Sequence, residues 1–315
     1  MKGIVGQHAK KWKKNGTVSS GCTRLSFAPK RKRAFSYKAS RVVLFGAGCF
    51  FIIFFVLSSV MALRTHLIGR SEQAAFDRIA EAISVCHQEE YTPPSYATVE
   101  TEEQDILNEQ EGLIRQGLLE ETWHTEYYTL YEQNPDFACW ISIDNTEINY
   151  PVMFTPDHPE YYLNRAFDGS KARSGTPFIG EGGSIESDCF IIYAHNMKNG
   201  TMFGTLDRYG KAGFWDKTPK FTISTILEKR EFEVFAVVKT RVLYNDESGF
   251  RYYYQVGDLD ENSFSTLIDW FLENSLYNTG ILPSYGDQIV LLSTCSYHSD
   301  NGRFVVAARH VRSAP

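Results

Sequence analysis

A run of 22 uncharged residues near the N-terminus restricts what this 315-residue chain can fold into. Residues 42–63, VVLFGAGCFFIIFFVLSSVMAL, are bounded by Arg41 and Arg64. As an α-helix this run would be about 33 Å long, which is enough to cross the hydrocarbon core of a bilayer. We therefore predict one transmembrane helix over residues 42–63.

Two alternatives to a membrane span are weaker. A buried core helix of this length would normally carry a polar stripe along one side, and this run has none. A cleaved signal peptide would have an apolar region of about 7–15 residues followed by an A-x-A-like cleavage site. The run is longer than that, and no clear site of this kind follows it.

The basic residues of the chain are concentrated before the apolar run. Twelve of the 32 Lys and Arg residues lie within residues 1–41, which contain no Asp or Glu, although the whole chain has a formal net charge of −6. A basic flank stays on the cytoplasmic side of a membrane. We therefore predict a cytoplasmic arm over residues 1–41 and a single-pass topology that exports residues 64–315. Aromatic residues are not interleaved with the basic run Lys30–Arg33, so we expect no nucleic-acid partner.

The first part of the exported region has a helical pattern. Apolar residues recur at helical spacing over residues 66–90 and again over about 102–131, with a Thr-Pro-Pro-Ser break at 92–95. We interpret residues 64–133 as an extracytoplasmic helical stalk or lead-in. Twelve acidic residues within 85–133 are most simply a solvated face, and a functional acidic patch is the alternative.

From Phe137 onward the apolar pattern changes to a period of two, which is typical of β-strands. Helical patterns interrupt it near 201–210 and over 258–274. About eight strands with long connections predict a mostly-β, closed or nearly closed barrel over residues 134–315. The candidate strands are residues 138–143, 146–154, 176–180, 188–196, 220–225, 230–242, 250–256, 287–296 and 303–312.

The cysteines do not form a metal or disulfide pattern. Six are present, with no C-x-x-C pair, and the chain has no HExxH motif. Cys139 and Cys189 are expected to be buried apolar thiols, and a Cys139–Cys189 disulfide is the alternative. The four exported cysteines are Cys86, Cys139, Cys189 and Cys295.

Three residues could combine into a site for nucleophilic catalysis. The segment QIVLLSTCSYHSDNGRFVVAARHV predicts a hairpin whose Asp-Asn-Gly turn would bring Cys295 beside Arg303. His195 ends another predicted strand, CFIIYAHN. A thiolate is a nucleophile, an imidazole can hold its proton, and a guanidinium can donate hydrogen bonds to an oxyanion. By spacing alone, each of the three residues is also a common structural residue.

Four longer segments resemble segments of one known family, and this resemblance favours a catalytic over a structural role for the three residues. LSTC, followed by a loop and RFVVAAR, resembles the catalytic strand pair of the sortases. YAHNMKNGTMFGTLDRY is similar to the histidine segment of class B sortases. NPDFACWISIDNTEINYPVMF and YYLNRAFDGSKARSGTPFIGE resemble the segments that precede it. The resemblance covers about residues 134–312, and the long insert with the 258–274 helix favours class B.

The resemblance implies a sortase-type barrel and a cysteine transpeptidase on a Gram-positive-type cell surface. Such enzymes cut the C-terminal sorting signal of a surface protein after a Thr, hold the acyl group as a thioester and pass it to an amine. The resemblance implies that Cys295 is the nucleophile, His195 the acid/base and Arg303 the oxyanion or substrate-orienting residue. His298, in the loop after Cys295, is a weaker candidate for the histidine. No cofactor or metal is implied.

The implied partners are a sorting-signal peptide and a peptidoglycan precursor or another amine acceptor, with the membrane contacted through residues 42–63. Two departures from the family pattern leave the functional groups in place: Leu291-Leu292 replaces a common Thr-Leu, and Ala194 replaces a common Gly. Two alternatives stay open. One is a pilin-polymerising or hydrolytic variant of the same enzyme. The other is a catalytically silent, membrane-tethered binding protein on the same barrel.

Overall fold

The computed structural model describes residues 37–86, 124–296 and 299–311. The chain divides into two compact units, Met1–Val60 and Met61–Pro315. The predicted basic arm before residue 37, the lead-in between residues 87 and 123, and His298 lie outside the described residues.

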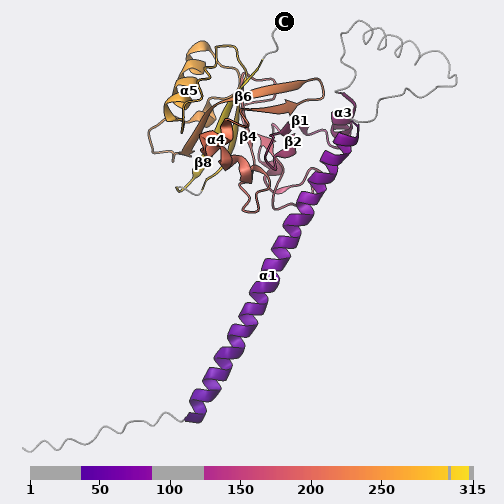
Figure 1. The fold of residues 1–315 in the computed structure, drawn as a ribbon, viewed down its shortest axis with the longest axis vertical. Helices are drawn as coiled ribbons and strands as arrows, with labels where there is room; N and C mark the ends of the chain where they lie inside the picture. The colour runs from indigo at the N-terminus through magenta and orange to yellow at the C-terminus, as the bar shows by residue number, and fades with distance from the viewer. Residues whose placement is uncertain (1–36, 87–123, 297–298, 312–315) are drawn as a thin grey trace, which may run out of the picture. The chain divides into compact units, whose positions relative to one another are not determined.

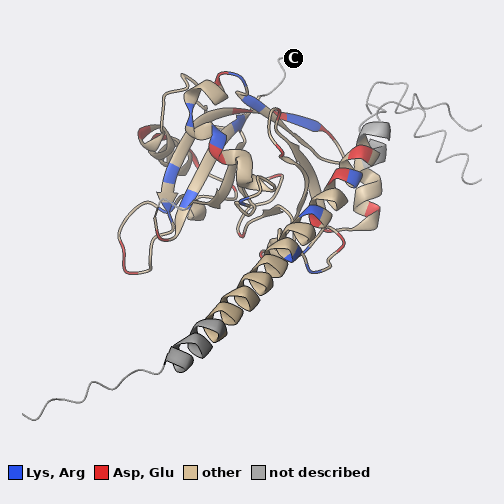
Figure 2. Ribbon diagram, turned by 60° about the horizontal axis from the view of Figure 1, so that its bottom comes forward, with Lys and Arg blue, Asp and Glu red and all other residues tan. Residues whose placement is uncertain are grey.

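One long helix contains the whole predicted membrane span. Helix α1 (Tyr37–Cys86) is continuous, so the two helices expected over 42–63 and from 66 onward are one (Figure 1). Every side chain described between residues 46 and 63 is exposed, which shows that the buried core-helix alternative is wrong. Within α1, the stretch from Gly46 onward is long and apolar enough to cross a membrane. The charged side chains described in α1 all follow residue 63 (Figure 2).

The second unit contains a closed, mixed β-barrel, as predicted (Figure 1). Its strands follow one another around the barrel in the order β1-β2-β3-β4-β7-β8-β6-β5, and β5 pairs with β1 to close it. The pairs β2–β3 and β4–β7 are parallel, and the other six are antiparallel. The strands are β1 (Phe137–Ser142), β2 (Asn149–Met153), β3 (Phe178–Ile179), β4 (Cys189–Tyr193), β5 (Lys220–Ser224), β6 (Lys229–Arg241), β7 (Ile289–Cys295) and β8 (Gly302–His310).

Both faces of the barrel wall are covered around β7, which explains why that strand is apolar at consecutive positions. Val290 and Leu292 belong to the larger apolar cluster of the unit, whereas Ile289 and Leu291 belong to a second cluster. Helix α5 (Glu261–Asn274) supplies Leu267 and other side chains to this second cluster. A strand that is buried on both faces has no polar side to alternate with its apolar side.

One predicted strand is wrong. Residues 250–256 do not form a strand, and Tyr252–Tyr254 form a single 3₁₀ turn, η3, instead. Every strand of the closed barrel already has a partner on each side, so no free edge remains for a ninth strand in this sheet. The aromatic residues of this segment instead pack on helix α5, where Phe250 and Tyr252 contact the ring of Trp270.

The remaining helices lie in the connections and at the start of the barrel. The predicted helical segment near 201–210 is confirmed as the 3₁₀ helix η2 (Phe203–Gly210). The ring of Tyr127 in α3 (His124–Gln133) lies parallel to that of Phe137 in β1, with ring centroids 6.3 Å apart. Phe76 of α1 contacts the ring of Tyr150 edge to face. The short helices in the connections and before the barrel are α3 (His124–Gln133), η1 (Tyr161–Asn164), η2 (Phe203–Gly210) and α4 (Ala212–Trp215).

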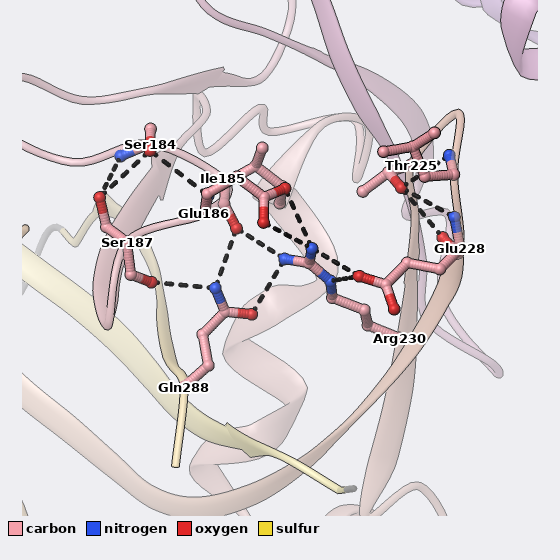
Figure 3. Close-up of polar contacts among 9 residues, drawn as sticks. Ser184, Ile185, Glu186, Ser187, Thr225, Glu228, Arg230 and Gln288 are labelled. Atoms are coloured by element: carbon pink, nitrogen blue, oxygen red, sulfur yellow. Dashed lines mark hydrogen bonds and ion pairs between the residues drawn. The ribbon is translucent and has the colours of Figure 1, made fainter. Parts of the chain in front are cut away.

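A buried arginine joins the segments that lead into three strands (Figure 3). The side chain of Arg230 in β6 is only 8 % exposed. Its guanidinium donates to Glu228 at 2.6 Å, to both carboxylate oxygens of Glu186 at 3.0 Å and to Ile185 O at 2.6 Å. Gln288, just before β7, accepts from Arg230 and donates to Ile185 O at 2.9 Å. The cluster therefore holds β6 and the starts of β4 and β7 together.

Removing this guanidinium should destabilise the fold more than removing an exposed cation. We expect Arg230→Met to lower the free energy of unfolding by about 2 kcal/mol, because several hydrogen bonds to a charged, buried donor are lost together. Lys220→Met is the control, since Lys220 pairs with Glu231 at 2.7 Å with both side chains at least 40 % exposed. Denaturant unfolding of the full-length chain in detergent measures both variants. Equal midpoints for the two would contradict this role of Arg230.

Candidate active site

The parallel pairing of β4 and β7 brings two distant residues together. The pairs run in constant register from Cys189–Ile289 to Tyr193–Ser293. Extended by two residues past the end of β4, the same register places His195 beside Cys295. The Ala194 N–H donates to Ser293 O at 3.4 Å, and the Thr294 hydroxyl donates to Ala194 O at 2.7 Å, so the two chains stay paired up to this point.

Cys295 and Arg303 are neighbours, as the predicted hairpin requires. Cys295 ends β7 and lies directly opposite Arg303 in β8. The Arg303 Nη1 donates to the Cys295 Sγ at 3.7 Å and to Gly302 O at 3.1 Å. The turn before Arg303 includes Asn301 in the left-handed conformation, with φ of 55°. Alternation along the strands puts both side chains on the face that α5 covers farther down the barrel.

The exposure of Cys295 distinguishes it from the other described barrel thiols. Cys295 is exposed, whereas Cys139 and Cys189 are buried, and all three are free. The Cys139–Cys189 disulfide is therefore absent. Burial raises the pKa of both Cys139 and Cys189, which disfavours their thiolate forms. Among these three cysteines, only Cys295 is open to solvent and next to a cation.

His195 is half-buried and held through its ring. Its Nε2 lies 2.8 Å from the carbonyl oxygen of Leu163 in η1. Its backbone carbonyl accepts from the Phe203 N–H at 3.0 Å, at the start of η2. The side chain of Asn196 next to it donates to the Cys295 carbonyl at 2.9 Å. The ring and the backbone of His195 and the side chain that follows it are therefore each held by a hydrogen bond.

His195, Cys295 and Arg303 line the same open cleft, whose volume is about 1090 Å³. Its other walls come from residues 157–163, from residues 178–182, which begin in β3, and from residues 253–256, which begin in η3. Aromatic side chains and carboxylates predominate there. Arg303 is the single Lys or Arg among the described lining residues. The cleft is therefore large enough for part of an extended peptide beside the thiol, and one cation, Arg303, lies next to that thiol.

A buried tyrosine that the sequence did not indicate supports β7 just below the thiol. The hydroxyls of Tyr252 and Ser293 are 3.0 Å apart, and both residues are buried. The Tyr252 ring stacks on Trp270 of α5 at 5.9 Å between centroids. Burial raises the pKa of Tyr252 to about 12, so this hydroxyl stays protonated. No local pattern marks this contact, because it depends on residues from three separate segments.

The arrangement is suited to acyl transfer. A solvent-open thiol, a guanidinium in contact with it and an imidazole in register with it supply a nucleophile, an oxyanion donor and a proton carrier. Among the residues that the structure describes, no group of three or more His, Cys, Asp or Glu side chains could hold a metal ion.

Comparisons with known proteins point to one family. No family model matches the chain. Sortase B of Listeria monocytogenes is 32 % identical over 190 residues, which are 59 % of this chain and 74 % of that protein. A Bacillus anthracis protein described as similar to sortase B matches the structure with a TM-score of 0.51 at 31 % identity, over 60 % of this chain and 84 % of that one. A Staphylococcus aureus sortase B–substrate complex matches with a TM-score of 0.59 at 22 % identity, over 79 % and 100 %.

The difference in burial predicts selective alkylation of the folded protein. Brief treatment with iodoacetamide should modify Cys295 and leave Cys139 and Cys189 unmodified, because only the first is exposed. Peptide mass mapping before and after denaturation measures the modification at each site. Equal labelling of Cys189 and Cys295 in the folded chain would contradict the burial described here.

Proposed function

This chain belongs to the class B sortases, a family of cysteine transpeptidases, and we propose that it cleaves a sorting signal and transfers the acyl part to a cell-wall amine. The substrate would be the C-terminal sorting signal of a surface protein, cut after a Thr. The observation that carries the proposal is the contact of Arg303 with the exposed Cys295 thiol, in a cleft that His195 also lines. The S. aureus sortase B has been solved as a complex with a substrate, and the shared fold is consistent with substrate binding in the same cleft here.

The proposed reaction has two acyl-transfer steps. The Cys295 thiol gives its proton to His195, and the sulfur attacks the carbonyl carbon of the scissile peptide bond. The C–N bond breaks, the leaving amine takes the proton from His195, and a thioester remains on Cys295. An acceptor amine then attacks the thioester carbonyl and passes a proton to His195. The C–S bond breaks, and the sulfur recovers its proton from His195.

Arg303 is proposed to stabilise the negative oxygen that forms in each step. A guanidinium stays charged and presents its N–H donors in a fixed plane. In the cleft it is the single Lys or Arg among the described lining residues, whereas Asp157, Glu160 and Glu181 supply carboxylates. The carboxylates would disfavour a negatively charged peptide and leave Arg303 as the place where negative charge is accepted.

Membrane anchoring is part of the proposal. We infer that residues 1–41 stay in the cytoplasm, that residues 42–63 cross the membrane, and that residues 64–133 lead outside to a catalytic barrel over 134–315. The exposed apolar side chains of α1 and the basic composition of the preceding segment support this topology. Protease added to intact cells should then digest the barrel and spare the basic arm.

One experiment separates this function from its alternatives. The purified full-length chain is incubated with a library of sorting peptides and candidate amines, and the products are identified by mass spectrometry. A new amide bond to an amine supports transpeptidation. Cleavage with water alone as the acceptor indicates the hydrolytic variant, and linkage to a lysine of a pilin subunit indicates the polymerising variant. A chain that binds peptides without cleaving them would be a binding protein.

Loss of the sulfur should abolish the chemistry. We expect Cys295→Ala to lose both cleavage and transfer, because no other described thiol lies on the cleft. Cys189→Ala is the matched control, since it removes a buried thiol from the adjacent strand and should retain both reactions. Product formation by each variant is measured with the same peptide and amine. Transpeptidation by Cys295→Ala would refute the assignment of the nucleophile.

Replacing Arg303 by lysine tests whether geometry or charge matters. Arg303→Lys keeps the positive charge but replaces a planar pair of donors with a single mobile ammonium group. If Arg303 is an oxyanion donor, turnover should fall roughly 10²–10³-fold, the range for loss of one such donor. Circular dichroism checks that the variant is folded. Turnover close to that of the unmodified enzyme would instead assign Arg303 a charge-balancing or structural role.

A further inference from the structure

The hydrogen bond made by His195 determines which of its nitrogens is available for chemistry. The partner of Nε2 is a backbone carbonyl, that of Leu163 at 2.8 Å. A carbonyl oxygen only accepts, so Nε2 must carry a proton and donate it. Nδ1 is then the nitrogen left to exchange a proton with the sulfur and the leaving amine. The position of the Leu163 carbonyl therefore sets the tautomer and the ring orientation of His195.

A neighbouring turn holds that carbonyl in place. Residues 172–176 pack against η1: the Ala172 N–H donates to Asn164 O at 3.1 Å, and the Thr176 N–H donates to Tyr162 O at 3.1 Å. Gly175, between them, has φ of +62° and lies directly against the Leu163 carbonyl. A side chain at Gly175 would overlap that oxygen, so the close approach requires glycine.

Helix α1 also holds this turn, through the side chain of Glu72. The carboxylate of Glu72 accepts from the Arg173 N–H at 2.9 Å and from the Ser174 N–H at 3.0 Å. Two charge-assisted hydrogen bonds to adjacent backbone groups fix the turn more firmly than one neutral bond would. A different α1 residue, Gln73, makes the neighbouring contact by accepting from the Tyr150 hydroxyl at 3.0 Å.

We propose that Glu72 of α1 is a positioning residue for the catalytic imidazole. It fixes the turn at residues 173–175, the turn fixes the Leu163 carbonyl, and the carbonyl holds His195 as the Nε2–H tautomer. The proposal rests on the proposed function, because the tautomer matters for turnover only if His195 carries the proton. Under this proposal, the part of α1 that follows the apolar span also supports the active site.

The test compares three variants of the full-length chain in detergent. Glu72→Ala removes both acceptors, Glu72→Gln keeps one carbonyl acceptor, and Gln73→Ala removes the adjacent contact between α1 and the barrel without touching residues 173–174. We expect Glu72→Ala to lower kcat about tenfold with little change in KM, because a slightly misplaced imidazole affects the proton transfers rather than binding. The kcat of Glu72→Gln should be intermediate, and the kcat of Gln73→Ala should be close to that of the unmodified enzyme.

The tautomer of His195 is measured directly, without substrate. ¹⁵N-labelled histidine reports which ring nitrogen carries the proton, and a His195→Asn sample identifies the signals of this residue. The unmodified chain should show the Nε2–H form, Gln73→Ala should retain it, and Glu72→Ala should show a mixture of both tautomers. This measurement stands even if no peptide is cleaved, so failure of the proposed function and failure of the positioning role are distinguishable.

Two results would overturn the proposal. One is the retention of kcat and of a pure Nε2–H tautomer in Glu72→Ala. The other is an equal loss of kcat in Glu72→Ala and Gln73→Ala, which would indicate a general effect of the contact between α1 and the barrel. Thermal melting accompanies each variant, and if Glu72→Ala does not fold, the same comparison is made with Glu72→Gln.

Discussion

The parallel pairing of β4 with β7 is the constraint on which the site depends. Its constant register places His195 in line with Cys295, although the two residues are far apart in the sequence. The antiparallel pairing of β7 with β8 then sets Arg303 opposite Cys295. A one-residue slip in either pairing would turn one of these side chains to the other face of the wall. The convergence of the three groups is therefore a property of strand register, more than of the loops around the cleft.

Two sets of contacts maintain that register at opposite ends of the strands. Arg230 and its partners tie the segments before β4 and β7 to β6 (Figure 3). At the other end, the buried Tyr252 hydroxyl contacts Ser293, and α5 covers the outer face below the cleft. The site itself is open and carries charged groups. The stability that holds it in place must therefore come from the covered wall and not from His195, Cys295 and Arg303 themselves.

Much of this architecture was predictable from local patterns. The hairpin joining Cys295 to Arg303 follows from two apolar strands around an Asp-Asn-Gly turn, and the structure confirms it. The role of residues 250–256 was not predictable in this way, because whether alternating aromatics form a strand depends on a free sheet edge, and a closed barrel has none. The contact of His195 with Leu163 involves a backbone carbonyl, which no side-chain pattern can mark. The placement of His195 beside Cys295 requires a long-range parallel pair, and the sequence suggested it only through resemblance to a family.

The central claim is that this fold presents Cys295 as the nucleophile of an acyl transfer. The most direct measurement is the site of acylation on the unmodified, full-length chain. The chain is incubated with a cleavable sorting peptide in the absence of an amine, quenched with acid and mapped by mass spectrometry. The account predicts that the N-terminal part of the peptide is attached to Cys295 through a bond that hydroxylamine cleaves, as expected of a thioester. Attachment at another residue, or cleavage without any acylated cysteine, would contradict it.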